Sequence, residues 1–483
     1  MSSYNIYRSR SLTLVCLINA FIYCTCHPSP RCLLISFDGF RWDYLNNAST
    51  PNFDKLIKDG VTATHGVVNA FITKTLPNHY TIVTGLYEES HGIVGNTMYD
   101  PLFNEVFHIS DKQQATESKW FDNGGEPIWV TNQRQGNAHR SGVLYWPGDG
   151  AAVKGFRPYR YEVYNPDVKN ETRVDKIIEW FTDDYPINLG LLYFEQPDAL
   201  GHEVGPDSPE MKIMIEALDG VVGYLLQKIE EHNLGDLNVI ITSDHGMAST
   251  PESKIIDLDM YINPTSYQIF SSDPIGSVLP NEGMEEEIVK NLSSVPHLKV
   301  YRKGVDIPDR FHYEHNRRIQ PLLLVTDEGY SLRHNNSYVP KGNHGYDNMF
   351  PDMHPLFVAM GPAFKTGSRI ETLHNVDIYP LVCHIMGLRP APNNGSLDHV
   401  RPILKGEDTD NVFLVYIVIL IFIALIGGIF SIAACRQQIF HRRHRKIQLG
   451  SLTTLTNSFH SLSTTANGGH VPLLVNSDTE DEF

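Results

Sequence analysis

The sequence predicts an α/β fold, in which a central and mostly parallel sheet is flanked by helices and carries a smaller inserted subdomain. Continuous apolar runs of strand length recur between residues 32 and 360, and such runs are typical of strands buried on both faces. Segments with apolar residues at helical spacing alternate with these runs, which is the order found in α/β layers. A less regular stretch over residues 265–335, with several prolines, predicts the subdomain.

Four apolar runs are the predicted strands of the main sheet, and a fifth belongs to the subdomain. Of the helical segments, one opens with Ser208 as a cap and Pro209 in its first turn, and another closes at Gly387. The main strands are expected at 32–37, 188–194, 237–243 and 355–360, the subdomain strand at 321–326, and the helices at 171–184, 208–232 and 376–387.

Residues 1–26 have the pattern of a secretory signal peptide. Arg8 and Arg10 precede an apolar run that is too short to span a bilayer comfortably. An uncleaved membrane anchor is the alternative interpretation. We therefore expect an extracellular body at 27–410 that begins once the signal has been removed.

Residues 412–435 carry no charged side chain and are long enough to span about 30 Å of hydrocarbon as a transmembrane helix. A buried core helix is the alternative, but a basic cluster follows at once and indicates a cytoplasmic C-terminal side. The sequence thus predicts a single-pass type I protein of the plasma membrane. Its tail, 436–483, is rich in Ser, Thr and Asn and is expected to be disordered. The basic cluster comprises Arg436, Arg442, Arg443, Arg445 and Lys446.

Glycosylation sequons agree with this topology, because all of them lie between the two apolar segments and none follows the second one. The one-sided distribution favours a lumenal or extracellular body. The acceptor residues are Asn47, Asn170, Asn291, Asn335 and Asn394.

The formal net charge of −17 argues against a nucleic-acid polymer as partner, because phosphate backbones bind basic surfaces. Small phosphate esters are still compatible with this charge, since bound metal ions can supply positive charge locally. The sequence carries no signal for the oligomeric state.

The six cysteines do not form an obvious disulfide framework. Cys16, Cys24 and Cys26 fall in the signal, and Cys435 lies at the membrane edge. The remaining pair, Cys32 and Cys383, lies in apolar contexts that favour buried free thiols. A single disulfide between these two stays open as the alternative.

Aspartates follow three of the predicted strands: Asp38, Asp198 and Asp244. Ligand sites in parallel sheets form outside the carboxyl ends of the strands, so we expect these carboxylates to converge. Converging carboxylates repel one another unless a cation holds them. Arg41 is the one arginine beside these motifs, and metal ions therefore explain the pattern better.

Histidines beside these aspartates support a metal site. Asp198 and His202 are spaced i, i+4, so one helical turn could aim both at one ion, while Asp244 and His245 are adjacent. His344 lies in a Gly-flanked turn, "GNHGYDN", which suits a metal loop. Oxygen and imidazole ligands without thiolates suit Zn²⁺, Mn²⁺ or Fe. Each residue alone could be a helix cap or a turn residue, but their joint recurrence after strands favours metal binding.

The stretch "FITKTLPNHYTIVTG" offers a nucleophile. Thr75 precedes Pro77 at a predicted helix start, where backbone N–H groups and the helix dipole favour an anion. A metal bound to the threonine oxygen would stabilise its alkoxide, which indicates attack on phosphorus. Asn78 and His79 are interpreted simply as residues of the helix start.

Five segments together resemble the ectonucleotide pyrophosphatase/phosphodiesterase family of the alkaline phosphatase superfamily. They occur in family order over residues 32–403, and the short single-span layout is most similar to the fourth and fifth members. The resemblance implies an alkaline-phosphatase-like sheet. The segments are "SFDGFRWDYL", "FITKTLPNHYTIVTGLYEESHGIVGNTMYD", "EQPDALGHEVGPDSP", "ITSDHGM" and "GNHGYDN".

The resemblance implies two Zn²⁺ per chain and a nucleophilic threonine, Thr75. Asn96 would donate to a non-bridging phosphate oxygen, together with the N–H that follows Thr75. One zinc would be held by Asp198, His202 and His344, and the other by Asp38, Asp244, His245 and Thr75.

The chain departs from the family pattern at one position. Nucleotide-cleaving members usually carry an aromatic residue directly after the nucleophile, where it stacks on the base, and here that residue is Leu76. Leucine packs against a base without aromatic stacking, which is worth about 0.5–1.5 kcal/mol. Tyr159 or Tyr161 is expected to cover the other face of the base.

These features predict a zinc-dependent phosphodiesterase that hydrolyses extracellular nucleotide phosphoanhydrides or phosphodiesters, such as dinucleoside polyphosphates or NAD, to nucleoside monophosphates through a threonyl intermediate. Leu76 leaves room for a second hypothesis, a phosphodiesterase of lysophospholipid or choline headgroups. The third hypothesis is a catalytically idle ectodomain used for adhesion or signalling. Sulfatase chemistry is disfavoured, because no Cys or Ser stands in a formylglycine-type setting.

Overall fold

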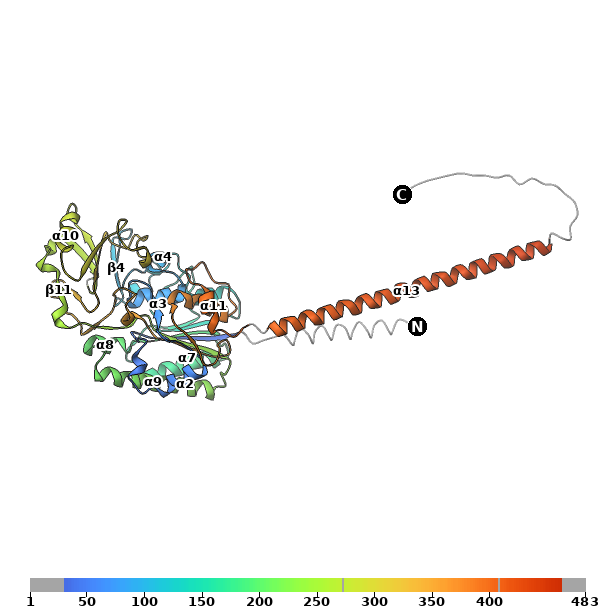
Figure 1. The fold of residues 1–483 in the computed structure, drawn as a ribbon, viewed down its shortest axis with the longest axis horizontal. Coiled ribbons are helices and arrows are strands. Elements are labelled where there is room, and N and C mark those ends of the chain that lie inside the picture. Colours follow the sequence, from blue (N-terminus) through green and yellow to red (C-terminus); the bar gives the residue numbers. More distant parts are fainter. Residues whose placement is uncertain (1–29, 272, 407–408, 463–483) are drawn as a thin grey trace. The chain divides into compact units, whose positions relative to one another are not determined.

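The computed structural model describes residues 30–271, 273–406 and 409–462 (Figure 1). The predicted signal peptide at 1–26, with its three cysteines, lies outside the described residues, as does 463–483. The chain divides into two units, Met1–Lys405 and Gly406–Phe483. The first unit contains the α/β fold, and the second contains one long helix.

Within the described residues, the main sheet has eight strands and is mostly parallel, as the apolar runs predict. Three of the predicted strands lie side by side at its centre. From one edge to the other the strands are β19 (Ser368–Ile370), β2 (Val61–Ala63), β18 (Phe357–Met360), β9 (Leu237–Thr242), β1 (Arg31–Phe37), β8 (Leu189–Phe194), β6 (Ser141–Leu144) and β7 (Arg160–Glu162).

The register of the central strands brings their carboxyl ends together. β1 pairs in parallel with β8 on one side and with β9 on the other, so Ser36 lies between Tyr193 and Thr242. Because the three strands end at the same edge, the residues that follow them enter a common volume.

One predicted strand runs the other way. β18 pairs antiparallel with both β9 and β2, although its apolar run was expected in a parallel interior. A strand is apolar on both faces because helices cover both faces of the sheet, whatever its direction. The run therefore predicts burial correctly and says nothing about orientation.

Helices cover both faces of the sheet (Figure 1). Alternate residues of β1 face them, because Leu33 and Ile35 belong to one apolar core cluster, and Cys32 and Leu34 belong to another. One face packs against α2 (Pro51–Asp59), α7 (Asn170–Thr182) and α9 (Pro209–Glu231), and the other against α3 (Thr75–Thr84) and α11 (Ile378–Ile385).

The predicted helix signals fit the observed ends. The Ser208 hydroxyl accepts the Met211 N–H at 3.1 Å and caps α9, and Pro209 is its first residue. Gly387, two residues beyond α11, has a φ of +66°, which a glycine adopts without strain.

The stretch predicted as a subdomain forms a separate antiparallel sheet with its own core, in which Ile288 and Leu292 pack with Leu322 and Leu324. Phe270 stacks on Tyr99 of the main body, with ring centroids 4.9 Å apart. Across this sheet the strands are β12 (Tyr267–Ser271), β13 (Ile275–Pro280), β15 (Leu322–Thr326) and β14 (Leu298–Arg302), and its helix is α10 (Glu285–Leu292).

Short elements complete the body; α8 carries Asp198 and His202 of the predicted metal site, and His344 directly follows β17. The strand pairs are β3 (Val67–Val68) with β20 (Leu373–His374), β4 (Thr97–Asp100) with β5 (Glu105–His108), β10 (Ala248–Ser249) with β17 (Gly342–Asn343) and β11 (Ile255–Asp257) with β16 (Ser331–Arg333). The helices are α4 (Glu88–His91), α5 (Ser118–Phe121), α6 (Ile128–Arg134), α8 (Asp198–Val204) and α12 (Leu397–Val400).

Cys32 and Cys383 are both buried free thiols, so the alternative of a disulfide between them is not realised. The five sequon asparagines all retain some solvent exposure, and Asn47, Asn335 and Asn394 are exposed.

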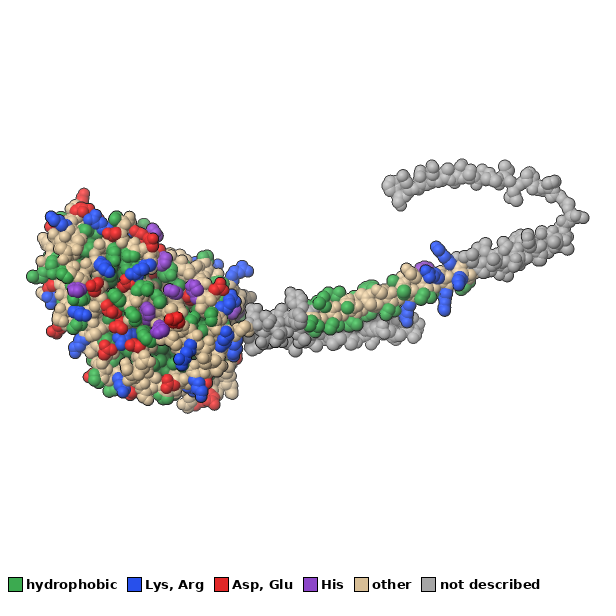
Figure 2. All heavy atoms as spheres, in the orientation of Figure 1, with side chains coloured by type: hydrophobic (Ala, Val, Ile, Leu, Met, Phe, Trp, Pro, Cys, Tyr) green, Lys and Arg blue, Asp and Glu red, His purple; other side chains and the backbone are tan. Residues whose placement is uncertain are grey.

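The second unit is built around α13 (Thr409–Leu462). Among the described residues, it is the one helix long and apolar enough to cross a membrane. Hydrophobic side chains run along it and Lys and Arg side chains follow (Figure 2). For residues 436–462 the structure has helix where the sequence predicts disorder. The Arg, Gln, Lys and Leu residues of this segment favour helix, and no proline interrupts it.

Candidate active site

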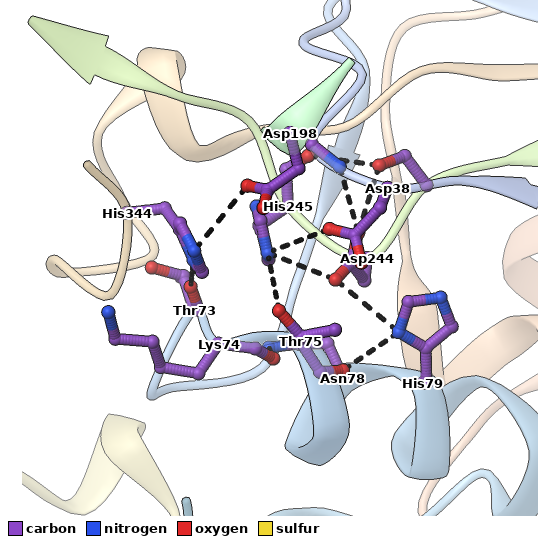
Figure 3. Close-up of polar contacts among 12 residues, drawn as sticks. Asp38, Thr73, Lys74, Thr75, Asn78, His79, Asp198, Asp244, His245 and His344 are labelled. Atoms are coloured by element: carbon purple, nitrogen blue, oxygen red, sulfur yellow. Dashed lines mark hydrogen bonds and ion pairs between the residues drawn. The ribbon is translucent and has the colours of Figure 1, made fainter. Parts of the chain in front are cut away.

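The three strand-end aspartates meet at the carboxyl edge of the sheet (Figure 3). Asp38 follows β1, Asp244 follows β9, and Asp198 opens α8 shortly after β8. The Asp198 N–H donates to the Asp38 backbone carbonyl at 2.9 Å. Gly39 permits this approach, because its φ is +69° and a Cβ there would lie 2.8 Å from the Asp198 Cβ.

The three predicted histidines share one tautomer. Each places Nδ1 against a backbone carbonyl, which must accept the Nδ1–H, so each Nε2 keeps its lone pair. A free lone pair on a fixed ring is what a metal ligand requires. The pairs are His202 with Gly342 O at 2.8 Å, His245 with Gly246 O at 2.9 Å and His344 with Thr73 O at 2.8 Å.

The Nε2 atoms face the carboxylates. His202 and His344 approach the two oxygens of Asp198 at 3.3 and 3.6 Å. His245 Nε2 lies 3.0 Å from Asp244 Oδ2 and 3.4 Å from Asp38 Oδ1. The six predicted ligand side chains therefore form one cluster.

Thr75 is the first residue of α3, and its buried hydroxyl faces this cluster (Figure 3). Its Oγ1 lies 3.3 Å from His245 Nε2. At this position the helix dipole and the free N–H groups of the first turn favour negative charge on the threonine oxygen. The predicted nucleophile thus adjoins the predicted ligands.

The electrostatics of the cluster call for a cation. Burial, with the neighbouring Asp244 and Asp198, raises the pKa of Asp38 well above its usual value. Burial also lowers the pKa of His344 well below its usual value, and His245 adds to this effect. Burial thus disfavours an ionised Asp38 and a protonated His344, and a bound metal ion would stabilise the carboxylate and accept the neutral imidazole.

Buried oxygens without a hydrogen-bond donor test whether a metal fits. Among the described residues, one oxygen of each predicted acid has no donor: Asp38 Oδ1, Asp198 Oδ1 and Asp244 Oδ2. Orphaned carboxylate oxygens are costly in a native fold, and together with the Nε2 lone pairs they make a donor set for divalent metal.

The ligand atoms fall into two groups that share His245. One group contains Asp38, Asp244 and His245, as the resemblance implies. The other contains Asp198, His344 and His245, whereas the resemblance places His202 in that set. His202 nevertheless contacts Asp198 from the next turn of α8, as the i, i+4 spacing predicts.

Asn96 lies beside the nucleophile, where it contacts the backbone of Leu76. The resemblance implies a contact with a phosphate oxygen of the substrate instead. The Asn96 Oδ1 accepts the Leu76 N–H at 2.8 Å. That N–H was expected to bind substrate directly, but here it fixes the Asn96 side chain. The Asn96 amide NH₂ group then becomes the donor available to a phosphate oxygen.

A cavity of about 360 Å³ opens beside Thr75 and Leu76. Seven of the 20 residues that line it are aromatic, and Tyr161 is among them, in line with one of the two expectations. Tyr159 is not part of this wall. Its ring is half exposed and lies near the Arg140 and Arg160 guanidinium groups, because Tyr159 precedes β7 while Tyr161 lies within it. The aromatic wall comprises Phe107, Phe121, Tyr145, Trp146, Tyr161, Tyr164 and Tyr193.

His79 is a site residue that sequence reasoning missed. It is fully buried, with Nδ1 2.8 Å from the Thr75 carbonyl and 3.4 Å from Asp244 Oδ2, while its Nε2 lies 2.9 Å from Ser36 Oγ. It therefore supports the nucleophile and a ligand without offering a free lone pair. Its i, i+4 spacing from Thr75 on a helix was the available signal.

Comparison with known proteins agrees with this geometry. The profile of the type I phosphodiesterase / nucleotide pyrophosphatase family matches residues 32–347, which include all of the predicted ligands. The chain belongs to the ectonucleotide pyrophosphatase/phosphodiesterase family. Its members' names indicate hydrolases of nucleotide phosphoanhydride or phosphodiester bonds, and its fifth member has been solved with the same alkaline-phosphatase-like fold.

Three relatives within the family illustrate the similarity. Human ectonucleotide pyrophosphatase/phosphodiesterase family member 5 is 47% identical over 378 residues, which is 78% of each chain. Human bis(5′-adenosyl)-triphosphatase ENPP4 is 45% identical over 381 residues, covering 78% of this chain and 83% of the relative. A murine family member 5 structure, an inactive threonine-to-alanine variant in complex with AMP, has a TM-score of 0.75 at 44% identity and covers 78% of this chain and 100% of its own.

The charge crowding at Asp38 gives a first prediction. In the metal-free protein, Asp38→Asn should raise the free energy of unfolding at pH 7, because it removes a buried carboxylate that Asp244 and Asp198 repel. A carboxyl whose pKa is raised in the folded state destabilises that state as the pH rises above its unfolded value, so the gain should vanish below about pH 4. Thermal unfolding of both proteins after chelation, across this pH range, measures it.

Asp38→Asn should also bind less zinc than the wild type. The effect of charge repulsion on stability is therefore measured without metal, and the role of Asp38 as a ligand is measured with zinc. Asn can still accept the Tyr193 hydroxyl, so loss of the fold is not expected. A variant that is less stable than the wild type without metal would show that Asp38 is not in a repulsive environment.

Proposed function

We propose that the chain is a two-zinc phosphodiesterase that hydrolyses extracellular dinucleoside polyphosphates, or related nucleotides such as NAD, to nucleoside monophosphates. One observation carries the proposal: the Thr75 hydroxyl stands between the six predicted ligand side chains and a cavity large enough for a nucleoside. A relative named for bis(5′-adenosyl)-triphosphate hydrolysis, 45% identical, supports this substrate class.

The ligand side chains would hold two metals. Asp198, His202 and His344 would bind one, and Asp38, Asp244 and His245, with Thr75, would bind the other. When bound, the metals would lower the pKa of the threonine hydroxyl and of a water molecule and stabilise the charge of the departing oxygen.

Thr75 performs the first step. Its Oγ forms a bond to phosphorus while the bond from phosphorus to the leaving oxygen breaks, which leaves a threonyl-nucleotide intermediate. Water then cleaves the Oγ–P bond and releases the nucleoside monophosphate. The N-terminus of α3 and the Asn96 NH₂ group stabilise negative charge on the phosphoryl oxygens.

Lys74 is placed to meet the leaving phosphate. Its side chain packs against Gly345 of the metal loop, where a Cβ would lie 2.6 Å from Lys74 Cε. Burial lowers the pKa of its ammonium group to about 8, although Asp273 and Asp198 act in the opposite direction. A half-buried cation next to the nucleophile suits the remaining anionic phosphates of a polyphosphate chain.

The second candidate function is a phosphodiesterase of choline headgroups, because the cavity wall offers several aromatic faces. Tyr145, Tyr161, Tyr164 and Trp146 line it, and aromatic cages bind quaternary ammonium groups by cation–π attraction. A choline-headgroup phosphodiester would place its trimethylammonium group there. We rank it second, because the nucleotide relatives favour a base in this cavity.

We also propose the predicted topology: a type I protein of the plasma membrane, with the body at 27–410 outside, a span at 412–435 and the tail inside. The apolar stretch of α13 and the basic residues after it support this orientation. The partly exposed sequon asparagines support glycosylation of the body.

The deciding experiment is a product assay with the full-length chain in detergent and zinc. Diadenosine triphosphate, NAD and lysophosphatidylcholine are offered separately, and products are identified by chromatography. Release of AMP from the dinucleotides at the highest kcat/KM is the expected result. Faster release of phosphocholine would establish the second candidate, and no product from any substrate would favour the idle ectodomain.

Leu76 gives a second prediction, on base recognition. Leu76→Phe should tighten AMP binding about 2- to 10-fold, because an aromatic ring gains about 0.5–1.5 kcal/mol of stacking and the cavity beside it has room. Calorimetry on the Thr75→Ala background measures binding without turnover. Leu76→Ala, which removes packing and adds no stacking, should weaken it. Unchanged affinity in the phenylalanine variant would mean that this position does not touch the base.

A further inference from the structure

Tyr193 joins the candidate metal site to the aromatic cavity. It lies on β8 with a side chain that is nearly buried, and its hydroxyl donates to Asp38 Oδ2 at 2.6 Å. Its ring is part of the cavity wall. The same side chain therefore faces a predicted metal ligand at one end and the substrate cavity along its ring.

Strand register produces this contact. Tyr193 pairs with Ser36 across β1 and β8, and the Asp38 N–H donates to the Phe194 carbonyl at 2.9 Å. Asp38 is thus held beside Tyr193 by the sheet itself. A rigid donor on a strand fixes a carboxylate better than a donor on a loop would.

The Tyr193 hydroxyl determines which carboxylate oxygen of Asp38 faces His245. Oδ2 is occupied by Tyr193, and Oδ1 has no donor and lies 3.4 Å from His245 Nε2. In the described residues, no other hydrogen-bond donor to the Asp38 carboxylate is found. Without the hydroxyl, the carboxylate could rotate away from Asp244, whose charge repels it.

His79 packs against Tyr193 and extends the support to a second predicted ligand, Asp244. The His79 ring meets the Tyr193 ring edge-on at 5.2 Å and the Trp146 ring at 5.0 Å, and Trp146 also lines the cavity. His79 in turn lies beside Asp244. The same packed rings therefore form part of the cavity wall and support the carboxylates of Asp38 and Asp244.

We infer that Tyr193 is a positioning residue that orients Asp38 for metal, in addition to forming the cavity wall. The inference rests on the proposed function only in taking Asp38 as a metal ligand. Loss of a hydrogen bond to a ligating carboxylate typically weakens metal binding 10- to 100-fold. Only the site that contains Asp38 should be affected, because among the described residues Tyr193 makes no side-chain hydrogen bond to Asp198, His202 or His344.

The test compares Tyr193→Phe with Tyr145→Phe. Both changes remove one hydroxyl from the wall of the same cavity, but Tyr145 has no recorded hydrogen bond to a predicted ligand in the described residues. Each full-length protein is loaded with zinc and dialysed against graded chelator, and bound zinc is measured by mass spectrometry. We expect Tyr193→Phe to release one zinc at 10- to 100-fold lower chelator strength and to keep the other, while Tyr145→Phe retains both.

Two further measurements exclude a merely structural role. AMP affinity at saturating zinc should be unchanged in Tyr193→Phe, because the ring remains. In an Asp38→Asn background, adding Tyr193→Phe should not change zinc retention further. Equal zinc retention by Tyr193→Phe and wild type, or parallel loss of both zincs in the two phenylalanine variants, would overturn the inference. A wild-type protein that binds no zinc would instead refute the proposed metal centre itself.

Discussion

The Thr75→Ala variant is expected to lose turnover by about 10³- to 10⁶-fold, the range seen when an enzyme loses its nucleophile, while its fold and zinc content stay close to wild type. The loss is large because the other cluster residues are predicted ligands, and the hydroxyls of Tyr193 and Ser243 are already committed to hydrogen bonds with Asp38 and Asp244. Steady-state hydrolysis of diadenosine triphosphate, with zinc analysis and thermal unfolding of the same samples, measures it.

The matched control is Thr84→Ala on the same helix. Thr84 is buried, and its hydroxyl donates to the Tyr80 carbonyl one turn earlier, away from the ligands. This variant should lose some stability and keep kcat. Thr75→Ser, which restores a hydroxyl, should recover part of the activity. If Thr75→Ala retains most of the wild-type turnover, the threonyl mechanism is wrong.

Removal of metal is expected to have the second large effect. Chelation should abolish activity and lower the unfolding temperature by about 10 °C. Two ligands that each occupy their site at a thousandfold above Kd contribute about 8 kcal/mol together, and a folded body of this size shifts by little more than 1 °C per kcal/mol. The three crowded carboxylates supply the physical reason, because they lose their counter-charge.

Adding back zinc should restore both properties, and magnesium should not, because the imidazole nitrogens suit zinc and magnesium prefers oxygen ligands. His344→Ala should need a higher zinc concentration for the same rescue. Full activity in the presence of excess chelator, with no zinc detected in the protein, would exclude a metal-dependent mechanism.

Much of the candidate site was predictable from short segments. An apolar run followed at once by aspartate identified Asp38 and Asp244, because strand ends in parallel sheets converge on one edge whatever the rest of the fold does. Helical spacing paired Asp198 with His202 for a similar local reason. His79 was missed, because its i, i+4 spacing from Thr75 indicates a neighbour of the nucleophile but does not show that Asp244 faces it.

The aromatic wall shows the limit of such reasoning more clearly. Tyr159 and Tyr161 have equal standing in the sequence, and only Tyr161 lines the cavity. The direction of β18 was likewise hidden, because its apolar residues report burial and not orientation.

The sequence by itself determined the alternation of strands and helices, the acids and histidines that follow them, the position of Thr75 and the apolar stretch near the C-terminus. These are properties of neighbouring residues, so a single pass along the chain contains them. The tertiary structure decided that His245 is shared between the two ligand groups, that Tyr193 holds Asp38 and that His79 supports Asp244. The Tyr193–Asp38 and His79–Asp244 contacts join residues more than 150 positions apart, and only the strand register and the packing of α3 against the sheet bring these side chains together.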